Sequence, residues 1–375
     1  MKVSILAAMR TAVAPRGGAF RDVPAHKLAA ALIGPVLAAA GVAPEDVDEV
    51  ILGNALSGGG NMARVAALAA GLPETVPALT IDTQCCSGLD AIRLGAARIM
   101  AGEARYVLAG GAESFSTAPL RAYRPREKDG MPDFYRQPAF TPWPEREIAL
   151  DASAAGMALA EGLTRAEQEA FAAESHRRAL TVPPADGEIV PVAGLAADAF
   201  ARRLSPALMA RLPVLSGDAT HGVTAATVAV EADAAALVLL GPAQAGDVTI
   251  AGGLARGGDP FVPALAPIVA VEALCARLGV AASAVDHVEL MEAYAAQALV
   301  AMRRLGLDPA RVNAGGGALA RGHPIGASGA ILAVRSYHRL RAGNAGRALC
   351  AIAGAGGIAS ALMLDRDGTG PAQDR

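Results

Sequence analysis

Asn313-Ala-Gly-Gly-Gly-Ala-Leu-Ala-Arg-Gly-His323-Pro-Ile-Gly-Ala-Ser-Gly329, near the C-terminus, is the stretch of sequence that decides the fold. It holds a histidine between glycine-rich turns, and the proline that follows suits the first turn of a helix. A second stretch, Asp82-Thr-Gln-Cys85-Cys86-Ser-Gly-Leu89, follows an apolar run and leads into another helical run. Together the two stretches predict a thiol and an imidazole, each held where a turn opens a helix.

An internal repeat links these two stretches. The segment Leu37–Val42 matches Cys275–Val280 at an offset of 238 residues, and other segments match in the same register. At that offset Cys85 falls on His323. Two duplicated halves that face each other would place both residues at equivalent helix starts near a pseudo-twofold axis. The repeat alone therefore predicts that the thiol and the imidazole meet.

The order of elements indicates an α/β architecture. In each half we expect a helix, a strand, a loop, a strand, a helix and a strand, an alternation that favours sheets between layers of helices. The segment between the halves differs, because it is rich in proline and charge and holds helical runs of its own. We therefore predict an N-terminal half (1–117 with 220–243), an inserted loop domain (118–219), a C-terminal half (244–365) and a flexible tail (366–375).

Composition and charge exclude several classes of protein. Apolar residues make up 53% of the chain, and the net charge of -3 gives no electrostatic reason to expect a nucleic acid as partner. The uncharged runs are too short to span a membrane, and the chain does not start with a signal peptide. The four cysteines have no metal-ligand spacing, so we expect no bound metal. Reduced thiols fit a cytoplasmic protein.

Cys85 and His323 are the candidate catalytic residues. A thiol at the start of a helix lies near the positive end of the helix dipole, so we expect its thiolate to be stabilised. Most single cysteines are buried packing residues, and most single histidines are satisfied within a turn, but the pairing of the two favours chemistry. Acyl transfer needs a nucleophile, a base that activates it and donors for the thioester oxygen. This pair supplies the nucleophile and the base, and part of the donors for the thioester oxygen.

The order of the motifs resembles that of the thiolase family over nearly the whole chain. The motifs that carry the resemblance are Met9-Arg-Thr-Ala-Val13 with Gly17-Gly18, Gly53-Asn54, Asn61-Met-Ala-Arg64, Cys85–Leu89, Ala109-Gly-Gly-Ala-Glu-Ser114, Glu292-Ala-Tyr-Ala-Ala-Gln297 and Gly322–Gly329. The resemblance implies a five-layered α/β/α/β/α fold, built from two duplicated halves with an inserted loop domain. It also implies a homodimer or a dimer of dimers.

The same resemblance implies chemistry on coenzyme A thioesters. Thiolases make or cleave 3-oxoacyl-CoA. In that scheme Cys85 carries the acyl group, while His323 activates the thiol and helps to hold the thioester oxygen. The implied substrate is an acyl-CoA or a related thioester, and no further cofactor is implied.

The chain departs from the family at positions that carry this chemistry. Met291 stands where the family has an asparagine that holds a water in the first oxyanion hole, and methionine donates no hydrogen bond. Ala351 stands where the family has the acid/base cysteine of Cys-x-Gly-Gly-Gly-x-Gly, a motif that here includes Gly354. Cys350 is one residue away, and it faces the other side of a strand unless a bulge shifts the register. We keep Cys350 as a candidate catalytic residue, and Met291, Ala351 and Gly354 as candidate substrate-binding positions.

Positions that touch coenzyme A in the family also differ. Thr227–Val230 stands where the family has Asn-x-Ser-Gly, and Leu150-Asp-Ala-Ser replaces its usual His-Met-Gly. Asp82 replaces the asparagine before the nucleophile. Arg202 and Arg203 are candidates for contact with a pyrophosphate, although two arginines on a charged helix more often form a solvated face.

The sequence therefore predicts a thiolase-like acyltransferase with an altered active site. It forms an acyl-Cys85 enzyme from an acyl-CoA and transfers an acyl group other than an aminoacyl group. The loss of the base that removes the α-proton harms condensation and thiolysis more than acylation. The alternatives are an ordinary acetyl-CoA C-acetyltransferase in which Cys350 serves after all, a decarboxylating condensing enzyme, and a catalytically weak thiolase homologue that acts as a subunit of a complex.

Overall fold

The structure, a computed structural model, describes residues 2–127, 129–135, 137–343 and 345–366. Its core is a ten-stranded sheet made of β1 (Val3–Arg10), β2 (Ala14–Pro15), β3 (Glu49–Gly53), β4 (Ala78–Ile81), β5 (Val107–Ser114), β10 (Ala232–Pro242), β11 (Val248–Gly257), β12 (His287–Leu290), β13 (Arg347–Gly354) and β14 (Ile358–Arg366). The order across the sheet is β12-β13-β14-β11-β1-β10-β5-β3-β4, and β2 pairs with β10. Two residue pairs join β1 to β11, so the sheet divides there into an N-terminal and a C-terminal half-sheet.

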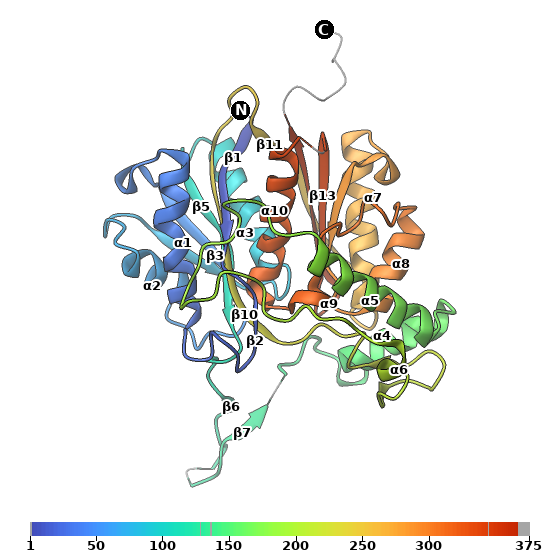
Figure 1. Cartoon of the computed structure of the whole chain (residues 1–375). Helices are drawn as coiled ribbons and strands as arrows, with labels where there is room; N and C mark the ends of the chain where they lie inside the picture. Colours follow the sequence, from blue (N-terminus) through green and yellow to red (C-terminus); the bar gives the residue numbers. More distant parts are fainter. Residues whose placement is uncertain (1, 128, 136, 344, 367–375) are drawn as a thin grey trace.

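Helices cover the outer faces of the two half-sheets and fill the space between them (Figure 1). α1 (Ala25–Ala40) and α2 (Met62–Ala69) pack on the outside of the N-terminal half-sheet. α7 (Ala266–Leu278) and α8 (Ala295–Leu305) pack on the outside of the C-terminal one. α3 (Ser87–Met100) and α10 (Ile325–Arg341) lie between the half-sheets in a shared apolar cluster. The predicted α/β/α/β/α arrangement is confirmed.

The two halves are duplicates in structure as well as in sequence. α3 begins at Ser87 and α10 begins at Ile325, with the same separation of 238 residues that divides the candidate catalytic pair. α1 and α7 both end at a glycine in the left-handed region, with φ of 65° at Gly41 and at Gly279. Glycine adopts this conformation at no steric cost and commonly ends a helix. The two helices therefore end in the same way, at equivalent places in the two halves.

Small residues bring the starts of α3 and α10 into direct backbone contact. A Cβ on Gly88 would lie 2.7 Å from the carbonyl oxygen of Gly326. A Cβ on Gly329 would lie 2.6 Å from the amide nitrogen of Leu89. Any larger side chain at these positions would push the helices apart. The glycines therefore set the distance between the two turns that precede these helices.

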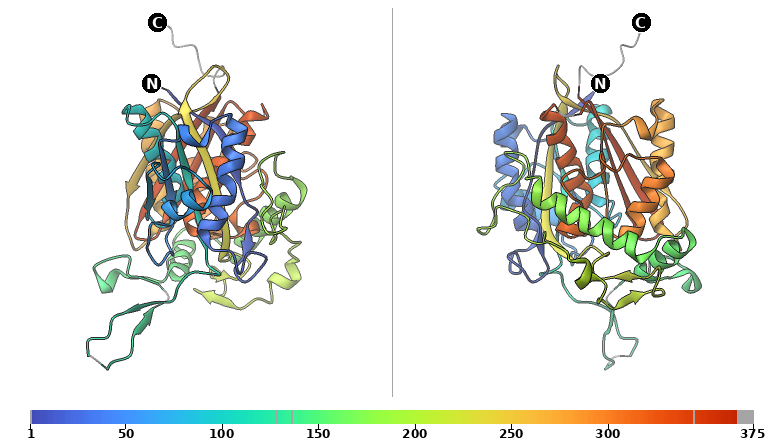
Figure 2. Two further views of the ribbon diagram at one scale, coloured as in Figure 1. Left: turned by 90° about the vertical axis from the view of Figure 1, so that its left-hand side faces the viewer. Right: turned by 45° about the vertical axis from the view of Figure 1, so that its right-hand side comes forward.

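The segment between the halves lies across one end of the core (Figure 2). It includes a projecting hairpin of β6 (Arg121–Tyr123) and β7 (Asp133–Tyr135). Its helices are α4 (Leu150–Ala160), α5 (Arg165–Thr181) and α6 (Pro206–Met209), and β8 (Val214–Ser216) pairs with β9 (Val223–Thr224). α4 contacts α8, and α5 contacts α8 and α9 (Ala318–Arg321). The inserted helices therefore lie against the C-terminal half.

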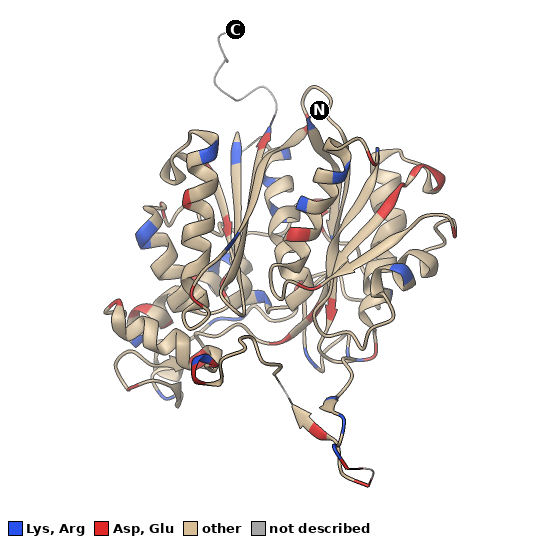
Figure 3. Cartoon of the chain, turned by 180° about the vertical axis from the view of Figure 1, so that it is seen from behind, with Lys and Arg blue, Asp and Glu red and all other residues tan. Residues whose placement is uncertain are grey.

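Short 3-10 helices also occupy Pro44–Asp46, Pro144–Arg146, Pro263–Leu265 and Ala282–Ala284. Arg366 is the last residue of β14, and the rest of the predicted tail, 367–375, lies outside the described residues. In the described part of the chain, no helix combines the length and the apolar character needed to cross a membrane. Along the ribbon in Figure 3, the positions of Lys and Arg and those of Asp and Glu are interspersed.

Candidate active site

Cys85 lies in a tight turn between β4 and α3. Gln84 has a left-handed backbone with φ of 53°, which turns the chain sharply just before the thiol. Asp82 Oδ1 accepts a hydrogen bond from the Gln84 N–H at 2.8 Å. Ser87 Oγ accepts from the Thr83 N–H at 2.9 Å and donates to the Gln84 carbonyl oxygen at 2.5 Å. These bonds fix the position of the thiol at the start of α3.

His323 meets Cys85 where the two halves face each other. His323 Nε2 lies 3.1 Å from Cys85 Sγ. On the other side of the ring, Nδ1 lies 2.7 Å from Ser328 Oγ, which donates its own proton to the Pro324 carbonyl oxygen at 3.0 Å. Because that hydroxyl proton is already engaged, Ser328 Oγ accepts from Nδ1–H, and the lone pair of Nε2 faces the thiol. The contact predicted from the repeat is present.

Two buried glutamates anchor the segments on either side of His323. Glu113, at the end of β5, accepts a hydrogen bond from the Gly326 N–H at 2.9 Å, in the first turn of α10. Glu292 accepts a hydrogen bond from Asn313 Nδ2 at 2.6 Å, at the start of the glycine-rich stretch. The sequence placed both glutamates within motifs, but their anchoring role became visible only from these contacts.

The thiol and the imidazole are both neutral in the resting protein. Burial raises the pKa of the Cys85 thiol to about 12, although hydrogen bonds from the N–H groups of Ala355 and of Cys85 itself act in the opposite direction. Burial also lowers the pKa of His323 to about 4. The expectation of a stabilised thiolate is therefore wrong for the free protein, because desolvation outweighs the effect of the helix start. The proton has to leave the sulfur during attack rather than before it.

Two backbone N–H groups converge on this sulfur. They belong to Cys85 and to Ala355, the residue that follows β13. Gly354, the last residue of β13, allows this approach, since a Cβ there would lie 3.1 Å from the Thr83 carbonyl oxygen and 3.2 Å from Cys86 Sγ. Paired N–H donors beside a nucleophile stabilise the oxyanion that forms in acyl transfer. The candidate Gly354 therefore acts through its backbone, by placing the next N–H group.

A cavity of about 50 Å³ opens beside Cys85. Its walls come from α4, from the 3-10 helix Pro263–Leu265, from the start of α8 and from the end of β13. It holds several times the volume that one water needs, which suits a short acyl chain. The lining residues are Cys85, Leu150, Ser153, Ala154, Pro263, Ala264, Ala293, Tyr294, Gln297, Ala353, Gly354 and Ala355.

Comparisons with known proteins identify the family of the chain. Residues 3–244 match the family model described as "Thiolase, N-terminal domain", and residues 247–366 match "Thiolase, C-terminal domain". The chain belongs to the thiolase family. The two matches meet between β10 and β11, close to the predicted start of the C-terminal half.

The alignments to related proteins cover nearly the whole chain of this thiolase. An acetyl-CoA acetyltransferase of Chromobacterium violaceum is 36% identical over 98% of this chain and 100% of its own length. A probable acetyl-CoA acyltransferase of Staphylococcus aureus is 37% identical over 90% of this chain and 93% of its own. The solved acetyl-CoA acetyltransferase of Bacillus anthracis has a TM-score of 0.90 at 30% identity, covering 97% of this chain and 98% of that one. Human mitochondrial 3-ketoacyl-CoA thiolase in complex with CoA has a TM-score of 0.89 at 29% identity, with the same coverage. The protein is therefore an acyltransferase of the thiolase type.

Cys350 lies outside the cavity of this thiolase. β13 pairs with β14 without a register shift from Arg347 to Gly354, so the bulge that would redirect Cys350 is absent. Its thiol faces α10, where Sγ lies 3.2 Å from Ser336 Oγ. The structure therefore does not bring this candidate catalytic residue to Cys85, because alternation along a regular strand points it the other way.

The positions of Met291 and Ala351 offer no side chain that transfers a proton. Ala351 does not line the cavity itself, but it packs in the same apolar cluster as Ala264, which does, whereas Cys350 packs in the cluster around α10. Met291 is 1% exposed within the central apolar cluster, and its N–H donates to the Ala351 carbonyl oxygen at 2.9 Å. At positions 291 and 351 the backbone groups bond to each other, but neither side chain carries a titratable group.

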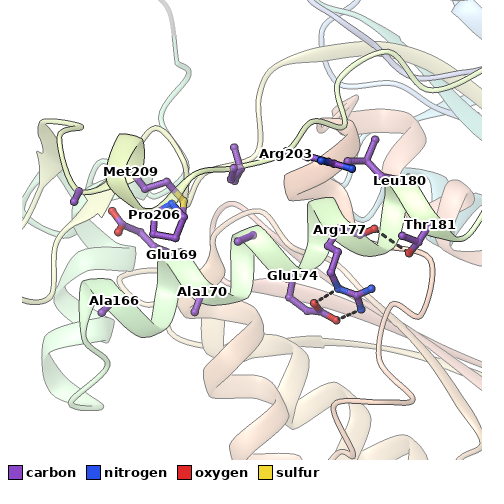
Figure 4. Close-up of a pocket in the computed structure, with 13 residues that line it drawn as sticks. Ala166, Glu169, Ala170, Glu174, Arg177, Leu180, Thr181, Arg203, Pro206 and Met209 are labelled. Atoms are coloured by element: carbon purple, nitrogen blue, oxygen red, sulfur yellow. Dashed lines mark hydrogen bonds and ion pairs between the residues drawn. The ribbon is translucent and has the colours of Figure 1, made fainter.

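Arg202 and Arg203 are not among the residues that line the Cys85 cavity. Both are exposed in the loop before α6 rather than on a helix, and the Arg202 guanidinium lies 4.1 Å from the centre of the Phe200 ring. Arg203 instead lines a separate cavity of about 980 Å³ between α5 and residues 203–210 (Figure 4). That cavity is larger, but the catalytic pair takes no part in it.

Proposed function

We propose that this thiolase forms an acyl-Cys85 intermediate from an acyl-CoA and then passes the acyl group, other than an aminoacyl group, to an acceptor. One observation carries the proposal. The Cys85 thiol lies 3.1 Å from His323 Nε2, and Ser328 holds the imidazole in the tautomer that accepts a proton from sulfur. A nucleophile, a base and a group that orients the base are the elements of covalent acyl transfer.

The first half-reaction uses groups already at the cavity. His323 Nε2 takes the thiol proton as the sulfur attacks the thioester carbonyl carbon. The carbonyl oxygen gains a negative charge, which the N–H groups of Cys85 and Ala355 stabilise. The tetrahedral intermediate then collapses and breaks the bond to the coenzyme A sulfur, which takes the proton from His323. The products are an acyl thioester on Cys85 and free coenzyme A.

The second half-reaction lacks its carbon base. Condensation requires removal of a proton from the α-carbon of a second thioester, and alanine at position 351 cannot take it. His323 is neutral again after the first half-reaction and accepts a proton from a hydroxyl, amine or thiol. We therefore infer that the acceptor is one whose attack does not depend on a base at position 351.

The donor and the assembly form the rest of the proposal. We infer that the acyl donor is a coenzyme A thioester and that no further cofactor takes part. The names of the relatives support the donor, and one related solved structure is a complex with CoA. We also propose a homodimer or a dimer of dimers in the cytoplasm, where the four free cysteines stay reduced.

Intact-mass measurement after incubation with acetyl-CoA tests the proposal. We expect a single acetyl adduct on the wild type and no adduct on Cys85→Ala. Cys350→Ala is the matched control, because it removes another buried thiol that lies outside the cavity, and it should still be acylated. If neither acetyl-CoA nor several longer acyl-CoAs gave an adduct, the catalytically weak homologue would be the correct interpretation instead.

A further inference from the structure

Two polar side chains reach the Cys85 cavity without a hydrogen-bond partner. Gln297 is 2% exposed, and its amide Nε2 makes no hydrogen bond. Tyr294, the extended residue directly before α8, is half-buried and lines the same cavity, and its hydroxyl makes no hydrogen bond to any residue of the described ranges. A buried donor without a partner, such as Gln297 Nε2, is rare, so the two side chains together indicate a site for a molecule that accepts hydrogen bonds.

The rest of the cavity lining leaves this role to Tyr294 and Gln297 alone. Ser153 also lines the cavity, but its hydroxyl already donates to the Phe261 carbonyl oxygen at 2.8 Å. Apart from Cys85, the other lining residues are alanine, leucine, proline and glycine. A side-chain hydrogen bond to an acyl group held in this cavity therefore comes from Tyr294 or Gln297.

Tyr294 brings a hydroxyl group to the wall of the cavity. Burial raises the pKa of this hydroxyl well above its ordinary value. It therefore stays protonated and available as a donor throughout the physiological range.

The charges around the cavity favour a neutral acceptor. The Asp151 carboxylate, on α4, also raises the pKa of Tyr294, which places a negative charge near its hydroxyl. An acyl chain that ends in a carboxylate would be repelled by this charge in a site of low dielectric constant. A hydroxyl oxygen would not be repelled.

We propose that Tyr294 and Gln297 select a short acyl group that carries a hydroxyl group in addition to its thioester carbonyl. The inference rests on the proposed acyl-Cys85 function. The Tyr294 hydroxyl and the Gln297 amide donate to the added oxygen, whereas a plain alkyl chain leaves both groups unpaired. A site built to bond an oxygen rejects the analogue that lacks it, because the buried polar groups of the site then lose their partner.

Acylation of Cys85 by two thioesters of equal chain length tests this selection. Butyryl-CoA and 3-hydroxybutyryl-CoA differ by one hydroxyl group, and the rate constant over KM for acylation is measured for each by rapid-quench mass spectrometry. We expect a preference of about tenfold or more for 3-hydroxybutyryl-CoA in the wild type. Tyr294→Phe and Gln297→Met should each lower that ratio toward one. Tyr123→Phe, on the exposed hairpin, removes an unrelated hydroxyl and should keep the wild-type ratio.

The outcomes separate this inference from the function on which it rests. Equal acylation by the two thioesters, or a ratio that survives in both cavity variants, would overturn the selection and leave the acyl-Cys85 function standing. A preference for succinyl-CoA would also overturn it, since that chain ends in a carboxylate. No adduct with any thioester would overturn the function and the selection together.

Discussion

The two sides of the candidate active site differ in how much of the thiolase chemistry they keep. On one side, α3 and α10 start from equivalent turns and bring the Cys85 thiol to 3.1 Å from the His323 imidazole. On the other side, Met291 directly follows β12 and Ala351 lies within β13, and their side chains transfer no proton. We infer from this comparison that acylation and carbon–carbon bond formation depend on separate parts of one site, and that only the first part is complete.

The largest effect is expected from His323→Asn, on the complete side, which holds Cys85 and His323. Without a base the thiol stays protonated, since burial holds its pKa near 12, so acylation by acetyl-CoA should slow by about 10²–10⁴-fold. Rapid-quench mass spectrometry of the adduct measures this rate. His26→Asn, on α1, is the control and should acylate at the wild-type rate. A loss of less than about threefold in His323→Asn would show that this imidazole is not the base.

A gain is expected on the incomplete side, from Ala351→Cys. This change places a thiol on the face of β13 opposite to Cys350, at the position where the resemblance puts the family's acid/base cysteine. Cleavage of acetoacetyl-CoA by coenzyme A should rise by about tenfold or more, because the carbon acid regains a proton-transfer group. The rate is followed by the loss of acetoacetyl-CoA absorbance. An unchanged rate would mean that Met291 also has to be replaced by the asparagine of the family, and the double variant with Met291→Asn tests this.

Ser328→Ala should have a smaller effect on the complete side. The imidazole keeps its contact with Cys85 but loses the group that holds Nδ1 in the protonated tautomer. We expect kcat for acylation to fall by about tenfold with little change in KM, as for other groups that orient a base. Ser328→Thr should restore most of the rate. A change in KM alone would point to a role in binding rather than in orientation.

The smallest catalytic effect is expected from Cys350→Ala. Its thiol contacts Ser336 on the far face of β13, so the acylation rate should stay within about twofold of the wild type. The variant should lose about 1–2 kcal/mol of unfolding free energy, because it removes a buried sulfur and its hydrogen bond. Chemical denaturation measures the loss. A large fall in acetoacetyl-CoA cleavage with unchanged stability would restore Cys350 as a catalytic residue.

The central contact could be predicted from the sequence because the repeat and the fold share one offset. Cys85 and His323 occupy equivalent places in two halves, and the glycines at 88, 326 and 329 let the helix starts touch. Strand alternation also predicted correctly that Cys350 and Ala351 face opposite sides of β13.

Other parts of the site were not accessible to sequence reasoning. α4 forms one wall of the cavity, but it belongs to the inserted segment and carries no motif that places it there. The neutral state of Cys85 depends on burial, which a motif does not report. Tyr294 and Gln297 stood within a motif quoted for the family resemblance, but their role depended on the unpaired amide of Gln297, which became visible only in three dimensions.

The most direct test of the account is the release of coenzyme A when enzyme and acetyl-CoA are mixed without an added acceptor. The account predicts a burst equal to the amount of enzyme, as Cys85 is acylated, followed by almost no further release and almost no acetoacetyl-CoA. The burst should disappear in Cys85→Ala. Sustained release accompanied by acetoacetyl-CoA would show that the side formed by Met291 and Ala351 still supports condensation, and would contradict the account.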